Sequence, residues 1–246
     1  MGLLIAIALV TGWAVSLVLL LPLDLEGVSF FWLGAVVLGR AFLHTGLFVL
    51  AHDAMHGSLV PGRPRINGAL GRLLLCLYGF LPYRECAINH ANHHRYPGEG
   101  RDPDFHDGVH CHPIAWYTKF MGEYLPQEHW PRLLSLWVGF IVSLHYLNQG
   151  HILNGLLFVL LPLGLSSMQL FYFGTYLPHR GDWDGLDNLH HAKTIAYPVV
   201  WSFITCYHFG YHWEHHEYPD VPWYRLPAVH LYQRQNHKIN HVSANE

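Results

Sequence analysis

The first 23 residues of the chain carry no charged side chain, and residues 3 to 21 are mostly Leu, Ile, Val and Ala. A helix rises about 1.5 Å per residue, so a run of this length crosses a hydrocarbon core of about 30 Å. A cleaved signal peptide would begin with a positive charge and end at a small-residue cleavage site. Met1 to Leu3 include no Lys or Arg, and Pro22-Leu23-Asp24 is a poor cleavage site. The run therefore predicts a retained membrane helix.

Three further apolar runs, over about residues 30–50, 133–147 and 152–176, are predicted to span the membrane as well. A shorter run over residues 66–82 predicts a re-entrant or interfacial hairpin. Charged residues make up 13% of the chain, about half the share in a soluble domain. We therefore expect an all-α integral membrane protein with four transmembrane helices. The net charge of −3 excludes a nucleic-acid binder, which would need a basic excess.

The distribution of Lys and Arg predicts the orientation of these helices. The loop at 22–29 holds Asp24 and Glu26 but neither Lys nor Arg, and the loop at 148–151 also lacks both. Because Lys and Arg collect on the cytoplasmic side, we expect residues 53–131 and 177–246 to form a His-rich helical cap there, at the cytoplasmic (inner) membrane. The chain has no internal repeat, so residues 1–246 are predicted to form one domain.

The 22 histidines outnumber the 14 Lys and Arg residues, and eight of them lie in three dense clusters. The clusters are HDAMH (His52, His56), HANHH (His90, His93, His94) and HWEHH (His212, His215, His216). Residues three or four apart share a face of a helix, so each cluster can direct its imidazoles to one place. A single pair of this kind can serve packing alone. Three clusters at the same face of one membrane indicate metal binding, because imidazole is the commonest metal ligand in proteins.

Eight imidazoles exceed the needs of one ion and predict two metals. Asp53 and Glu214 lie within the clusters, on the side of their turns away from the histidines. We expect them to accept a hydrogen bond from the ring N–H that does not bind metal. The alternative for Asp53 is a helix cap.

The same clusters resemble those of the integral-membrane di-iron fatty-acid desaturase and hydroxylase superfamily, in order and in position. The flanking stretches resemble the bacterial β-carotene ketolases within it. These stretches are AHDAMHGSL (51–59), NHANHHRYPGEGRDPDF (89–105), TYLPHRG (175–181) and YHFGYHWEHHEYPDVPWYRLP (207–227). Glu217, directly after the third cluster, departs from the apolar residue expected there.

The resemblance implies a ninth ligand, for which His179 is the candidate and His208 the rival. His190 and His191 are neighbours in sequence, do not share a helical face, and are not expected to bind metal. Asp104 and Asp102, in GRDPDF, either support the ligands or form a loop turn with Pro103. Asp53 and Asp104 are thus the candidate catalytic carboxylates.

The resemblance also implies a reaction: two irons and O₂ convert the C4 methylene of a β-ionone ring into a ketone, which turns β-carotene into echinenone and canthaxanthin. The carotenoid would arrive from the lipid bilayer. No dinucleotide fingerprint is present, so the electrons need a separate donor such as ferredoxin with its reductase. The alternatives are a carotenoid 3-hydroxylase, or an acyl desaturase or alkane hydroxylase with the same clusters. A metal transporter would hold its ligands near the bilayer midplane rather than at helix ends.

Arg40 lies near the centre of the second apolar run, where a charge is costly. It can pair with an acidic residue or a backbone carbonyl, anchor a polar end of the substrate, or extend to the membrane surface if the run is shifted. His44, one to two turns deeper than His52, is a candidate to line the substrate pocket.

Overall fold

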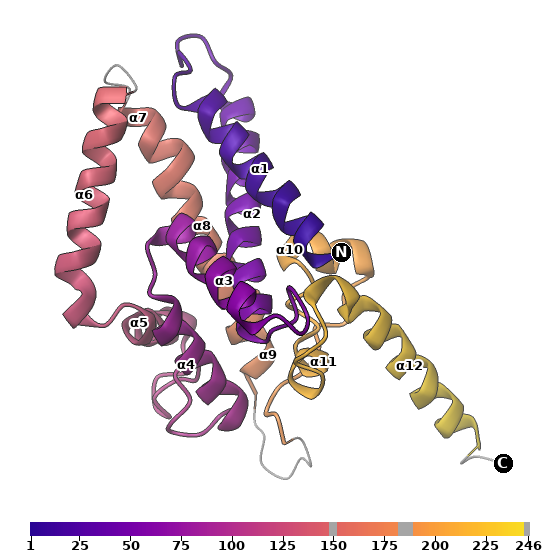
Figure 1. Cartoon of the computed structure of the whole chain (residues 1–246). Coiled ribbons are helices and arrows are strands. Elements are labelled where there is room, and N and C mark those ends of the chain that lie inside the picture. Colours follow the sequence, from indigo (N-terminus) through magenta and orange to yellow (C-terminus); the bar gives the residue numbers. More distant parts are fainter. Residues whose placement is uncertain (148–151, 182–188, 244–246) are drawn as a thin grey trace.

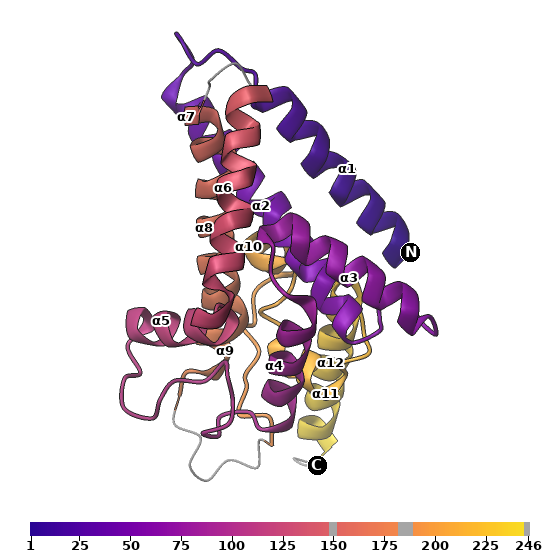
Figure 2. The same ribbon diagram turned by 60° about the vertical axis from the view of Figure 1, so that its left-hand side comes forward.

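The computed structural model describes residues 1–147, 152–181 and 189–243; the predicted loop at 148–151 lies outside this part of the chain. All regular elements in the described residues are helices. The turn between α1 and α2 and the facing ends of α6 and α7 lie at one end of the molecule, whereas α4, α9 and α11 lie towards the other (Figures 1 and 2).

Three helical segments are long and apolar enough to cross a membrane. They are α1 (Gly2–Leu20), α2 (Phe30–Met55) and the continuous segment Ile152–His179, with mean hydropathies of 2.6, 1.7 and 1.8. The third segment comprises α7 (Ile152–Gly155), η2 (Leu156–Leu160), α8 (Leu161–Leu170), η3 (Phe171–Tyr176) and α9 (Leu177–His179). Three of the four predicted spans are therefore helices of spanning length.

The fourth predicted span forms α6 (Trp130–Leu147), which follows the short helix η1 (Gln127–His129). It is not among the three segments above. Its 18 residues include Arg132, Ser135, Ser143 and His145, which lower its hydropathy. In Figure 1, α6 meets the third segment at α7, and the two diverge from there.

The run at 66–82 forms one helix rather than the predicted hairpin. This helix, α3 (Pro64–Gly79), begins with Pro64 at a position where its missing N–H costs nothing, and it ends at Phe80 in the left-handed conformation, with φ of 60°. It packs against α2. The chain then turns into α4 (Tyr83–Arg95) and α5 (Pro113–Tyr124).

The C-terminal part of the chain packs against the third segment through α8 and η3. It forms α10 (Val199–Cys206), α11 (His212–Glu217), η4 (Trp223–Arg225) and α12 (Leu226–Ser243). Tyr207 and His208, with φ of 47° and 64°, reverse the chain between α10 and α11. Helix α12 extends away from the body (Figure 1).

The third segment contains two prolines. A stretch of wider, π-helical turns ends two residues before each of them. η2 ends at Leu160 before Pro162, and η3 ends at Tyr176 before Pro178. Proline has no N–H, so the carbonyls of Phe158 and Gly174 lose their usual donor four residues along the helix. The Phe158 carbonyl accepts a hydrogen bond from a side chain instead.

Arg40, which is only 1% exposed, bonds to the first of these carbonyls. Its Nε donates to Phe158 O at 3.1 Å, and its Nη1 donates to Trp13 O and to Ser16 Oγ, each at 2.7 Å. The guanidinium also lies over the Trp13 ring. The sequence left several roles open for Arg40. In the structure it pairs with backbone carbonyls and so connects α1, α2 and η2.

His44 does not line the cavity described below. Its Nδ1 accepts from Trp13 Nε1 at 3.2 Å, so its Nε2 carries the proton and donates to Tyr78 O at 2.5 Å. His44 thus links α2 to α1 and α3.

We expect Arg40→Met to destabilise the bundle, because two carbonyls and a hydroxyl would lose a charged donor inside the membrane. The expected loss is roughly 2–4 kcal/mol. Thermal unfolding in detergent micelles measures it, with Arg65→Met on the exposed side of α3 as the matched control. Equal unfolding midpoints for the two variants would contradict this role of Arg40.

Candidate metal centre

Nine histidines from four parts of the chain converge at one end of the bundle, and they are the nine predicted ligands. His52 lies in the last turn of α2, and His56 follows that helix directly. His179 ends α9, and the remaining six lie on α4 and α11 (His90, His93, His94, His212, His215, His216). The ends of two segments of spanning length therefore meet the two short helices α4 and α11.

The histidines form two groups, and the ligand atoms within each group lie within 4.8 Å of one another. The first histidine group consists of His52, His56, His90, His94 and His215, and the second of His93, His179, His212 and His216. Each HxxHH cluster is divided between the groups. His90 and His94, four apart, share one face of α4, whereas His93 points to the other group; on α11, His212 and His216 pair while His215 points away.

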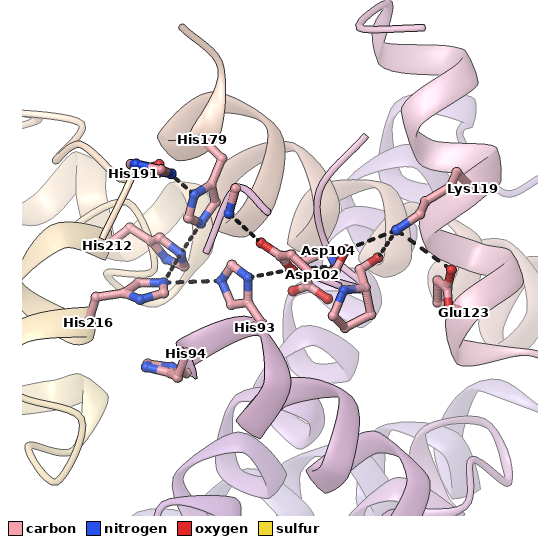
Figure 3. Close-up of polar contacts among 12 residues, drawn as sticks. His93, His94, Asp102, Asp104, Lys119, Glu123, His179, His191, His212 and His216 are labelled. Carbon is pink, nitrogen blue, oxygen red and sulfur yellow. Dashed lines mark hydrogen bonds and ion pairs between the residues drawn. The ribbon is translucent and has the colours of Figure 1, made fainter. Parts of the chain in front are cut away.

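Short distances between Nε2 atoms mark the centre of each group. In the first, His56 lies 2.7 Å from His90, and His94 lies 2.9 Å from His215. In the second, His179 lies 2.8 Å from His212, and His216 lies 3.0 Å from His212 and 3.1 Å from His93. Figure 3 shows these rings of the second group facing one another.

Two partners fix the tautomers in the second group. His93 Nδ1–H donates to Asp102 Oδ1 at 2.9 Å, and His179 Nδ1–H donates to the backbone carbonyl of His191 at 2.8 Å (Figure 3). Each ring then presents a lone pair at Nε2 to the centre of the group. Converging lone pairs repel one another unless a cation lies between them.

Burial keeps most of these imidazoles neutral. It lowers the pKa of His56 to about 4 and those of His90, His212, His215 and His216 well below their ordinary value, and repulsion between neighbouring rings lowers these last four further. Burial also lowers the pKa of His93, but the carboxylates of Asp104 and Asp102 outweigh it, so the net shift is upward. A metal ligand must be neutral imidazole, so the cluster is prepared for binding at neutral pH.

The residues present fit a pair of transition-metal ions. At a metal–nitrogen distance of about 2.1 Å, two ligands at a right angle lie about 3 Å apart, which matches the distances between the Nε2 atoms. Imidazole suits iron, copper, nickel and zinc rather than magnesium or calcium. Each histidine group can hold one ion, with five and four nitrogen donors.

Asp102 and Asp104 perform different tasks. Asp102 accepts from His93, from Gly98 N at 2.9 Å and from Asp104 N at 2.8 Å, so it both supports a ligand and closes the loop turn. Although burial raises the pKa of Asp102, the neighbouring His93 and these hydrogen bonds lower it overall. Asp104 instead accepts from Tyr124 OH at 2.7 Å, and burial raises its pKa to about 6.

Asp53 and Glu214 do not make the contacts predicted for them. Asp53 Oδ1 lies 3.9 Å from His52 Nδ1, beyond hydrogen-bonding distance, and accepts from Trp223 N at 3.3 Å. Glu214 accepts from Thr194 Oγ1 and, at 2.6 Å, from His230 Nδ1. Asp53 thus binds a backbone N–H of the C-terminal region, and Glu214 binds two side chains there. Neither carboxylate binds an imidazole of the histidine groups. They lie beside the clusters in sequence, but the helix turns them towards α12 and η4.

His208, the rival ninth ligand, belongs to neither group; its ring stacks on those of Tyr211 and Trp223. His190 pairs with Glu217, Nε2 to Oε2 at 2.8 Å, which gives a partner to the acidic residue that departs from the expected pattern. The roles of the His191 carbonyl, His230 and Thr194 were missed from the sequence, because each depends on a tertiary contact and has no spacing signal.

A cavity of about 1110 Å³ adjoins both histidine groups. At one end it is lined by His52, His90, His93, His212 and His215, together with Asp53 and Asp104. From there it extends along α5, α6 and α8, with apolar lining that includes Phe120, Leu133, Trp137, Leu160 and Leu163. The described lining residues include no Lys or Arg. The cavity therefore connects the candidate metal centre to the apolar level of the bundle.

The fatty acid desaturase family matches the chain over residues 26–242, and the chain belongs to this family. Within it, the chain is similar to the β-carotene ketolases of two Paracoccus strains. It is 47% identical to that of strain N81106 / MBIC 01143 and 43% identical to that of strain PC1, over 78% of this chain and 76% of each relative. It is also 36% identical to the zeaxanthin 4-ketolase of Chlamydomonas reinhardtii, over 87% of this chain and 48% of that protein. No solved structure matches the chain.

Replacing Asp102 with Asn should weaken metal binding by the second histidine group about 10- to 100-fold, because the carboxylate holds His93 in the ligating tautomer. Titration of the metal-free protein with Co²⁺, followed by its absorption, measures the affinity. Asp107→Asn is the matched control, since Asp107 lies in the same loop but is exposed and pairs only within it. If both variants bind cobalt alike, Asp102 has no part in ligand positioning.

Proposed function

We propose that the protein is a carotenoid 4-ketolase, which converts the C4 methylene of a β-ionone ring into a ketone. The observation that carries this proposal is the apolar cavity that ends at nine converging histidines. The similarity to β-carotene ketolases along most of both chains supports it. The products from β-carotene would be echinenone, with one ring oxidised, and canthaxanthin, with both.

Two iron ions are proposed as the cofactor, because the desaturase family is a di-iron family and two groups of imidazoles are present. The first histidine group would hold one ion and the second the other, with His179 as the ninth ligand. When bound, the irons supply the activation of O₂ that breaks an unactivated C–H bond. The chain's own residues orient the ligands: Asp102 and the His191 carbonyl set two tautomers, and Asp53 keeps η4 against the end of α2.

The cavity lining favours a carotenoid over a carrier-linked acyl chain. Acyl carriers bring phosphate or other charged groups, and the described lining has no basic side chain to receive them. Phe48, Phe120, Trp137 and Phe209 offer flat apolar surfaces to a ring and a polyene. The cavity reaches α6 and α8, so the substrate would enter from the bilayer. A carotenoid 3-hydroxylase remains the alternative, since it would need the same metal centre and the same apolar route.

The remaining membrane arrangement is proposed on the same basis. α6 would be the fourth span, because it meets the spanning segment at α7 and extends from that end of the molecule towards the end that holds the histidines (Figure 1). The histidines would face the cytoplasm at the inner membrane, since the loop at 22–29 lacks Lys and Arg. Electrons would come from a separate donor such as ferredoxin with its reductase. A reporter fused after Glu246 should be active on the cytoplasmic side, and activity only in the periplasm would contradict this orientation.

We expect two irons per chain in the purified protein, and His179→Ala should reduce this towards one because the second group would keep three ligands. His208→Ala, which alters a buried histidine outside both groups, should keep two. Elemental analysis measures both. One iron in the parent protein, or loss of iron from the His208 variant alone, would refute this assignment.

Expression in a host that accumulates β-carotene should yield echinenone and canthaxanthin and shift the colour towards red. The spans give an apolar route to the metal centre, and the carbon that bears the first hydroxyl still has a hydrogen to lose. Pigment extraction and chromatography identify the products. Accumulation of 3-hydroxy products would favour the hydroxylase instead, and unchanged β-carotene with altered membrane fatty acids would favour the desaturase.

A further inference from the structure

Asp104 is held rigidly in the cavity wall beside the second histidine group. Its N–H donates to Asp102 Oδ1, its carbonyl accepts from Trp116 Nε1 at 2.7 Å, and its Oδ1 accepts from Tyr124 OH. Asp102 in turn is bonded to His93. Two hydrogen bonds in succession therefore connect the Asp104 backbone to His93 in the second histidine group, and the other two fix its carbonyl and its carboxyl. Figure 3 shows Asp104 next to Asp102.

One carboxyl oxygen of Asp104 is left for a ligand. Oδ2 accepts no hydrogen bond from the described residues, and the protein does not seal it off. Asp53 Oδ2, by contrast, also lacks a partner but is enclosed, and Tyr117 OH is already bonded to Ser167 Oγ at 2.9 Å. Asp104 is thus a rigid acceptor with a free oxygen on a largely apolar cavity.

Ketone formation by two oxygenations passes through an alcohol halfway through the reaction. In the first oxygenation, R₂CH₂ + O₂ + 2e⁻ + 2H⁺ gives R₂CHOH + H₂O. In the second, R₂CHOH + O₂ + 2e⁻ + 2H⁺ gives R₂C(OH)₂ + H₂O, and loss of water from the gem-diol leaves R₂C=O. A one-electron donor protein supplies the four electrons. The half-oxidised ring must therefore stay, or return, with its remaining C–H towards the histidines.

The geometry of a tetrahedral carbon decides where the new hydroxyl lies at that moment. When the remaining hydrogen at C4 points to the metal centre, the hydroxyl on the same carbon points about 109° away, into the cavity wall. An apolar wall would leave this hydroxyl without a partner, and the buried group would be costly. A charged or polar acceptor in the wall stabilises that orientation.

We propose that Asp104 binds the 4-hydroxyl of the half-oxidised ring through Oδ2 and so retains it for the second oxygenation. This inference rests on the proposed function. Tyr124, which donates to Oδ1, keeps the carboxyl directed into the cavity. By holding the alcohol in the cavity until the second oxygenation, Asp104 favours release of the ketone over release of the alcohol.

The test measures the ratio of 4-hydroxy to 4-keto products from β-carotene for the parent, Asp104→Asn and Asp104→Leu. We expect the alcohol share to rise about tenfold in Asp104→Leu, because the hydroxyl loses its acceptor, and by less in Asp104→Asn, whose amide can still bond. Asp107→Asn, which makes the same chemical change on the exposed part of this loop, should keep the parent ratio. A merely structural role would lower total turnover and leave the ratio unchanged.

A binding measurement on the parent protein tests the proposal even if an Asp104 variant fails to fold. The metal-free parent should bind 4-hydroxy-β-carotene about tenfold more tightly than β-carotene, as followed by quenching of tryptophan fluorescence, and Asp104→Leu should lose this preference. Equal affinities in the parent, or an unchanged product ratio in both Asp104 variants, would overturn the role of Asp104. If the parent forms no ketone at all, the proposed function itself fails.

Discussion

The convergence of nine imidazole lone pairs is the constraint on which the arrangement of α2, α4, α9 and α11 depends. Neutral imidazoles attract one another weakly, and their lone pairs repel when they meet at about 3 Å. The fold must therefore force them together from rigid elements, or a cation must hold them. Helix ends are suited to bringing the rings together, because a helix fixes the direction of each side chain. The membrane in turn fixes the depth at which α2 and α9 end. The two short helices α4 and α11 complete the arrangement.

The spanning segments solve a related problem inside the membrane, where a polar group without a partner is costly. Pro162 withholds an N–H from Phe158, and the guanidinium of Arg40 supplies the missing donor. The same side chain bonds to α1, which is otherwise mostly exposed. The Arg40 charge would destabilise an isolated membrane helix, but here its hydrogen bonds connect α1, α2 and η2. Pro178 likewise withholds an N–H from Gly174, where the segment borders the cavity.

The cavity connects the histidine groups to the apolar interior between the helices. Its far part lies among apolar side chains of α6 and α8, and its inner end lies at the histidines. Such a shape suits a long apolar molecule whose reactive end alone reaches the metal centre. Polar groups of the described lining near that end, Asp53 and Asp104 among them, lie where they could orient a substrate that carries oxygen.

The sequence by itself determined the class of protein and the identity of the nine histidines that converge. Apolar runs and helical spacing are local properties, so they predicted the membrane helices and the faces of α4 and α11. The hairpin predicted at 66–82 was wrong, and the fourth span stays a prediction, because short apolar runs form several structures. Only the tertiary structure decided which histidines share a group, since His93 and His179 are far apart in sequence. It also decided that Asp102 supports a ligand, whereas Glu214 binds His230, because the partner of a carboxylate depends on which distant segment packs against it.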